Sequence, residues 1–191
     1  VEDYKGEKDS KEYKSLEKEL KKAEKSFNSV NEKYQFVESV IADLKQYNSE
    51  EFETLNNLQD AAGNSVDVYV VAKGNLIDDR TGQRIDGMTE VQLNKTSEVM
   101  KYETKEQVFI ASVKSRYGEN TATILLNMKS ENPGETMAHE GGHAIYEVQN
   151  KAEYNLWLKR HPGERDAHGF GNPSGERAKK EEGTYRKNKK Q

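Results

Sequence analysis

Two histidines and a glutamate occur in this chain at a spacing that metal-dependent enzymes use. His139 and His143 are four positions apart, and Glu140 directly follows the first histidine. On a helix, residues four positions apart lie on one face, so both imidazoles could bind the same metal ion. Glu140 would lie about 100° round the helix, within reach of a metal-bound water. This His-Glu-x-x-His pattern indicates metal-assisted hydrolysis.

The neighbouring residues predict the helix that this pattern requires. Asn132 suits an N-cap, Pro133 suits the first helical position and Glu135 suits the third. Gly141 and Gly142 lie inside the predicted helix, where each glycine costs about 1 kcal/mol relative to alanine. The glycine pair therefore predicts that another element packs closely against this helix.

Composition restricts the remaining possibilities. The 191 residues include no cysteine, so a metal must be held by His, Asp or Glu. A net charge of −4 with mixed signs argues against a nucleic-acid surface. No apolar run approaches the roughly 20 residues that cross a bilayer, so we expect no membrane span. Because the chain begins at Val1 and shows no apolar signal segment, we expect a fragment or processed product of a longer protein.

The first 45 residues are mostly polar, but their apolar residues alternate at spacings of three and four. This spacing predicts one long amphipathic helix. The helix could pack along its own domain, or it could expose the stripe as a dimerising coiled coil or a surface for a partner. The mixture of Tyr, Ala and Phe favours the first alternative. We define this apolar stripe by its ten members, Tyr13, Leu16, Leu20, Ala23, Phe27, Val30, Tyr34, Val37, Ile41 and Leu44.

The remaining segments predict an α+β fold. We expect a short helix from Ser49, a strand at 65–71, a loop or weak hairpin at 73–94 and a hairpin formed by 108–117 and 121–128. A last helix should begin at Asn172 and Pro173. The prediction is a small antiparallel or mixed sheet with a motif helix, a long N-terminal amphipathic helix and a C-terminal helix. We divide the chain into that long helix, 1–48, and a catalytic domain, 49–191.

The motif resembles that of the zincin superfamily of metallopeptidases. The resemblance implies that His139 and His143 bind Zn²⁺ and that Glu140 is the general base. It also implies a zincin-like fold, with residues 123–127 as the edge strand beside the substrate cleft. On this interpretation the chain hydrolyses a peptide bond of a protein or peptide substrate, using a water that the zinc activates.

The third zinc ligand is less evident. The extended signature of metzincins has a third histidine six residues after the second one, and that position is Gln149 here. Glu182 shares a partly apolar helix face with Ala178 and Tyr185, and a carboxylate there needs a partner such as a metal. We therefore favour Glu182 as the third ligand. The alternatives are Glu181, His168 and His161, with Glu147, Asp166 and Glu176 as further candidates.

Residues 182–186, Glu-Gly-Thr-Tyr-Arg, resemble the Glu-x-x-Tyr-Arg ending of zincin domains in bacterial effectors and Rhs-type polymorphic toxins. The resemblance implies a toxin or effector domain, secreted or delivered as part of a larger bacterial protein. An immunity protein or the parent polypeptide would then be a partner. The competing hypothesis is a non-enzymatic helical interaction module, with a structural or vestigial metal site.

Overall fold

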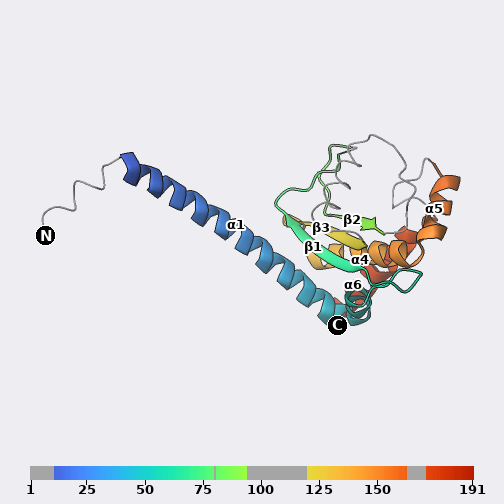
Figure 1. Ribbon diagram of the computed structural model, residues 1–191. Coiled ribbons are helices and arrows are strands. Elements are labelled where there is room, and N and C mark those ends of the chain that lie inside the picture. Colours follow the sequence, from blue (N-terminus) through green and yellow to red (C-terminus); the bar gives the residue numbers. More distant parts are fainter. Residues whose placement is uncertain (1–10, 80, 94–119, 163–170) are drawn as a thin grey trace, which may run out of the picture.

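A computed structural model describes residues 11–79, 81–93, 120–162 and 171–191 (Figure 1). Within these residues the chain forms five helices and a three-stranded mixed sheet, so the predicted α+β class is confirmed. The helices are α1 (Lys11–Tyr47), α2 (Ser49–Asn56), α4 (Pro133–Gln149), α5 (Lys151–Arg160) and α6 (Pro173–Lys189). The strands are β1 (Asp67–Lys73), β2 (Gly87–Gln92) and β3 (Thr121–Asn127).

β3 is the central strand of the sheet. It runs parallel to β1, with Val70 opposite Ile124, and antiparallel to β2, with Thr89 opposite Ile124. All seven residues of β3 are buried. The prediction that residues 123–127 form the edge strand is therefore wrong, and β2 lies at an edge of the described sheet. The run of apolar residues at 124–126 is typical of a strand that is covered on both faces.

Two other predictions for this region are confirmed in part. The weak hairpin predicted within 73–94 is present as an antiparallel bridge between Ile77 and Arg84. The same segment also contains β2, whose sequence Gly-Met-Thr-Glu-Val-Gln has no strong apolar alternation. Its pairing with β3 therefore determines the strand more than its own composition does. The second half of the predicted 108–128 hairpin is confirmed as β3, but residues 108–117 lie outside the described residues.

The core lies where α4 packs between the sheet and the other helices. α4 contributes Met137, Ala138, Ala144, Ile145 and Val148, all of which are buried. β3 covers one side of this cluster, while α1 contributes Val40 and Leu44, α2 contributes Leu55 and α6 contributes Tyr185. The motif helix is thus the central helix of the body.

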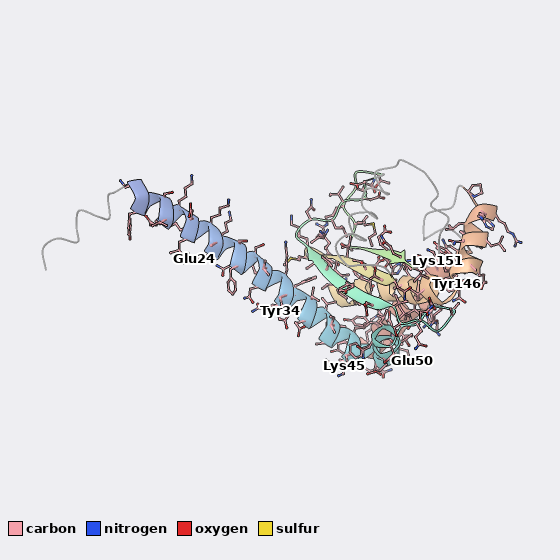
Figure 2. The ribbon with its side chains drawn as sticks, viewed as in Figure 1. Glu24, Tyr34, Lys45, Glu50, Tyr146 and Lys151 are labelled. Atoms are coloured by element: carbon pink, nitrogen blue, oxygen red, sulfur yellow. The ribbon has the colours of Figure 1, made fainter. Side chains whose placement is uncertain are left out.

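α1 is partly inside this body and partly outside it. Val40 and Leu44 are buried in the core, whereas Leu16 and Phe27 are 64% and 70% exposed. The N-terminal part of α1 extends away from the body, and Figure 2 shows Glu24 on this extension. The long helix is confirmed, but only its last turns pack along its own domain, so most of the apolar stripe is exposed.

The glycine pair in α4 allows two close contacts. A Cβ at Gly142 would lie 2.6 Å from the Cα of Ala178 in α6, and a Cβ at Gly141 would collide with the carboxylate of Glu51 in α2. Real Cβ atoms do not approach other heavy atoms this closely. The predicted close packing against the motif helix is therefore confirmed.

Gly142→Ala should destabilise the fold by about 1–3 kcal/mol, because the new methyl group meets the α6 backbone, which cannot rotate away. Urea unfolding measures this change. Gly183→Ala is the matched control, since Gly183 lies in α6 with nothing within 4 Å of the added Cβ. That control should gain up to about 1 kcal/mol from helix propensity. Similar effects of the two substitutions would contradict the packing argument.

A carboxylate pair is buried between α2 and α6. Asn48 Nδ2 donates to Glu51 Oε2 at 2.8 Å and to Glu181 Oε2 at 3.0 Å, while Arg177 Nε lies 2.6 Å from Glu181 Oε1. Glu51 is only 1% exposed. Burial, with a smaller contribution from the neighbouring Glu181 carboxylate, raises the pKa of Glu51 to about 9. Glu51 is therefore neutral in the folded protein at neutral pH.

This raised pKa predicts that stability falls as the pH rises. The folded protein keeps the Glu51 proton up to about pH 9, whereas the unfolded chain loses it near pH 4.3. The contribution of the protonated Glu51 to the unfolding free energy is therefore full below about pH 4.3 and declines from there to about pH 9. Glu51→Gln, which is neutral at every pH, should make the decline in unfolding free energy shallower. Glu50→Gln, at an exposed neighbour, is the control. An unchanged slope for Glu51→Gln would contradict the assignment.

Candidate metal centre

The two histidines of the motif converge through the same nitrogen of each ring. Nε2 of His139 lies 3.2 Å from Nε2 of His143, and the two rings meet edge to face. Two nitrogen ligands of a tetrahedral zinc ion lie about 3.3 Å apart when each Zn–N distance is about 2.0–2.1 Å. The observed separation therefore fits two histidine ligands of one ion.

The opposite nitrogen of each ring has a hydrogen-bond partner. His139 Nδ1 lies 2.8 Å from Glu182 Oε2, and His143 Nδ1 lies 2.7 Å from Ser174 Oγ. The Ser174 hydroxyl donates to Glu147 Oε1 at 3.0 Å, so it accepts from the histidine ring. Both partners therefore favour a proton on Nδ1. This tautomer leaves the Nε2 lone pair for a metal ion, as in many metal sites.

The start of α6 positions Ser174. The Oδ1 of Asn172 accepts hydrogen bonds from the backbone N–H groups of Ser174 at 3.0 Å and of Gly175 at 3.3 Å. The predicted helix start at Asn172 and Pro173 is confirmed. Sequence reasoning did not identify Ser174 as a site residue. The Asn-Pro-Ser cap was a visible signal, but the contact with His143 depends on how α6 packs against α4.

The corresponding cap of α4 differs. Asn132 is the N-cap and Pro133 is in the first turn, as predicted, but the Asn132 side chain makes no capping hydrogen bond. Glu135 does not cap the helix either; it pairs with Arg186 of α6 at 2.6 Å. Contacts between α4 and α6 thus replace part of the local cap that the sequence suggests.

Glu140 lies on the side of α4 that faces β2. It is 8% exposed, and its Oε2 accepts a hydrogen bond from the Thr89 hydroxyl at 2.7 Å. A Cβ at Gly87 would lie 2.7 Å from Glu140 Cγ, so this glycine leaves room for the carboxylate. Burial raises the pKa of Glu140 to about 7, and the Thr89 hydrogen bond opposes that shift. Thr89 and Gly87 are not evident as site residues from the sequence, which predicts only a loop or weak hairpin at 73–94.

Glu182 lies beside His139, on the Nδ1 side of the ring. One carboxylate oxygen contacts Nδ1, and the other pairs with Arg186. This is the position of a residue that orients a metal-binding histidine. To bind the ion itself, the carboxylate would have to leave Nδ1 and turn towards Nε2. Its assignment as the third ligand stays a prediction.

Several of the other candidates for the third zinc ligand contact residues away from the histidine pair. Glu181 contacts Asn48 and Arg177 in the buried carboxylate pair. His161 is the C-cap that follows α5, and its ring stacks on Trp157, with ring centres 4.3 Å apart. Glu176 pairs with Lys179 on the surface of α6.

The last two candidates, His168 and Asp166, lie outside the described residues. Among the residues that the structure describes, no group of three or more His, Asp or Glu side chains could hold a metal ion. The described part of the chain therefore provides a pair of convergent histidines rather than a complete set of ligands.

Comparisons with known proteins return no relative. No protein-family model, no curated protein and no solved structure matches the chain. In the described part of the chain, no helix is long and apolar enough to cross a membrane. The geometry of the site itself is therefore what indicates a function.

Substitutions of Glu182 separate a direct ligand from a residue that orients His139. If Glu182 orients the ring, Glu182→Gln should retain most zinc affinity, because its amide oxygen still accepts from Nδ1, and Glu182→Ala should weaken binding about 10–100-fold. If Glu182 is a ligand, both substitutions should weaken binding strongly. Competition of zinc against a chromogenic chelator measures the affinities. Glu176→Gln, on the exposed face of α6, is the control.

Proposed function

We propose that this chain is a zinc-dependent hydrolase of peptide bonds, with His139 and His143 as metal ligands and Glu140 as general base. The observation that carries the proposal is the 3.2 Å separation of the two Nε2 atoms, with both Nδ1 atoms held by other side chains. With protons on both Nδ1 atoms, neither Nε2 can donate a hydrogen bond to the other, so two acceptors lie 3.2 Å apart. A cation bound by both would replace this contact between acceptors with two favourable contacts.

A zinc ion bound there would polarise the scissile carbonyl and lower the pKa of its bound water. Glu140 would hold the proton that the attacking water loses and deliver it to the leaving amine. The Thr89 hydroxyl fixes one oxygen of this carboxylate from β2. Burial raises the pKa of Glu140, which favours a carboxylate that accepts a proton and then holds it until the leaving group takes it.

The surrounding fold supports a zincin-type assignment. The motif helix α4 lies against a mixed sheet, and the antiparallel edge strand β2 is the strand that contacts Glu140. An extended peptide bound along β2 would have its backbone close to Glu140, which supports a peptide substrate. We accordingly propose a protein or peptide as the substrate.

The C-terminal resemblance to toxin and effector domains has a structural counterpart. Glu182 and Arg186, the first and last residues of the Glu-x-x-Tyr-Arg ending, pair with each other beside His139. Tyr185 is buried and donates to Asp43 of α1 at 3.2 Å. The ending thus links the candidate metal centre to α1. The sequence resemblance of this ending is what supports our proposal that the chain is a domain of the effector or toxin type.

Glu140→Gln should retain about one equivalent of zinc per chain but reduce peptide hydrolysis about 10²–10⁴-fold, because the proton acceptor is lost while the ligands remain. Metal analysis and cleavage of a quenched fluorescent peptide library measure the two properties. Glu131→Gln, an exposed substitution just before α4, is the matched control.

Two results would contradict the proposal. The parent protein, loaded with zinc and freed of excess metal, could retain far less than one equivalent, in which case the histidine pair is not a zinc site. Alternatively, Glu140→Gln could retain the parent's hydrolysis rate. A protein that binds zinc but shows no hydrolysis with or without Glu140 would favour the non-enzymatic interaction module.

A further inference from the structure

The projecting part of α1 carries an apolar surface that its own domain does not cover. Its large apolar side chains are between 42% and 70% exposed, at Tyr13, Leu16, Leu20, Phe27, Val30 and Tyr34. Together with Ala23 they are separated by alternating steps of three and four residues, the repeat that a left-handed coiled coil requires. A surface of this kind on one side of a solvated helix indicates association with another helix.

Large and small residues alternate along this stripe in a specific order. In heptad notation the a positions are Tyr13, Leu20, Phe27 and Tyr34, and the d positions are Leu16, Ala23, Val30 and Val37. The a side chains are therefore mostly aromatic, while the d side chains are aliphatic and include the small Ala23. The order of sizes restricts which helix can pack against the stripe.

We propose that α1 pairs with α1 of a second copy of this chain, as an antiparallel two-helix coiled coil over residues 13–37. In this arrangement each a residue faces a d residue, so Phe27 packs against the partner's Ala23 and Leu20 against the partner's Val30. The same register places Tyr34 on the partner's Leu16 and Tyr13 on the partner's Val37. Every layer then combines a larger side chain with a smaller one, which packs a core without voids.

A parallel pair would pack less well. Identical residues would face each other, so two Phe27 rings would crowd one layer and two Ala23 methyl groups would leave a gap in the layer before it. Both defects lie in the middle of the exposed stripe. The side-chain sizes therefore favour the antiparallel pair.

The charges that flank the stripe favour the same arrangement. In the antiparallel register Glu19 faces the partner's Lys33, and the two-fold symmetry produces this pair twice. In a parallel pair Glu19 would instead face the partner's Glu24, also twice, and like charges would oppose each other. The antiparallel pair has one unfavourable contact, between the two Glu24 side chains near the two-fold axis.

The exposed area is sufficient for a stable dimer. Burying six large apolar side chains removes on the order of 100 Å² each from water, or about 600 Å² per copy. The pair would then bury about 1,200 Å² in total, which exceeds the roughly 1,000 Å² expected of a specific interface.

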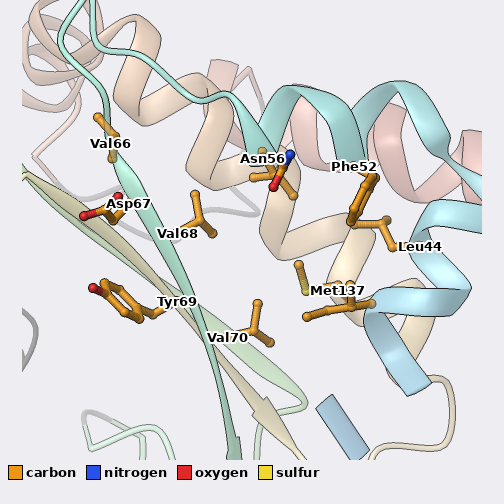
Figure 3. Close-up of a pocket in the computed structure, with 11 residues that line it drawn as sticks. Leu44, Phe52, Asn56, Val66, Asp67, Val68, Tyr69, Val70 and Met137 are labelled. Atoms are coloured by element: carbon orange, nitrogen blue, oxygen red, sulfur yellow. The ribbon is translucent and has the colours of Figure 1, made fainter. Parts of the chain in front are cut away.

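The stripe also continues into an apolar groove on the body. Ile41 and Leu44, its last two members, line a groove of about 570 Å³ together with Val68, Val70 and Met137 (Figure 3). An antiparallel partner helix would bring its N-terminal end to the mouth of this groove, next to Val37. The body therefore offers apolar surface at the point where the second helix ends.

Sedimentation equilibrium of the full chain tests the proposal between about 1 and about 100 μM. The parent should be a dimer, and Phe27→Glu should raise the dissociation constant at least tenfold, because a charge replaces an aromatic ring in the centre of the interface. Lys25→Glu, on the opposite face of the same helix, is the matched control and should remain dimeric. A parent protein that is monomeric at the highest concentration would overturn the proposal.

Charge reversal tests the orientation. Glu19→Lys should weaken an antiparallel dimer about fivefold, because two Glu–Lys pairs become Lys–Lys contacts, and adding Lys33→Glu should restore the parent affinity. In a parallel dimer Glu19→Lys would face the partner's Glu24 and strengthen association. A stronger dimer for the single substitution, or no recovery in the double variant, would overturn the antiparallel arrangement.

Discussion

The close approach of α4 and α6 determines most of this structure. Gly142 leaves no side chain between the helices, so the backbone of Ala178 occupies the space where a Cβ would lie. The same packing brings Ser174 to His143 and Glu182 to His139. The geometry of the histidine pair therefore depends on a methyl group that is missing at the residue directly before His143. Such packing also explains why a helix accepts the conformational cost of two adjacent glycines.

Carboxylates surround the motif helix, and each occupies a different environment. Glu182 is paired with Arg186 and with an imidazole, Glu147 accepts from a serine hydroxyl, and Glu140 has a threonine hydroxyl as its partner. Glu51, deeper in the body, is neutral because burial raises its pKa to about 9. Burial without a cation raises the pKa of a carboxylate, and a cation or an N–H donor lowers it. One fold thus combines charged and proton-holding carboxylates within a few turns of helix.

Most of the apolar residues of α1 lie outside the core of a single chain. A single apolar repeat runs along the whole helix, but the body covers only its C-terminal end, where Val40 and Leu44 are buried. The remaining apolar residues do not contribute to this core and are exposed, as Phe27 shows. If two copies pair as we propose, the low apolar content of one chain reflects a core that two chains complete. The two bodies would then lie at opposite ends of the paired helices.

The sequence by itself determined the features that depend on neighbours within one or two helical turns. These are the motif helix with His139 and His143 on one face, the start of α6 at Asn172, and the long helix with its repeat, because hydrogen bonds and side-chain spacing within a helix are local. Only the tertiary structure decided that β3 is central, that Thr89 holds Glu140 and that Glu182 meets the Nδ1 side of His139. These contacts join residues 29 to 54 positions apart, and chain packing, rather than any local pattern, brings them together.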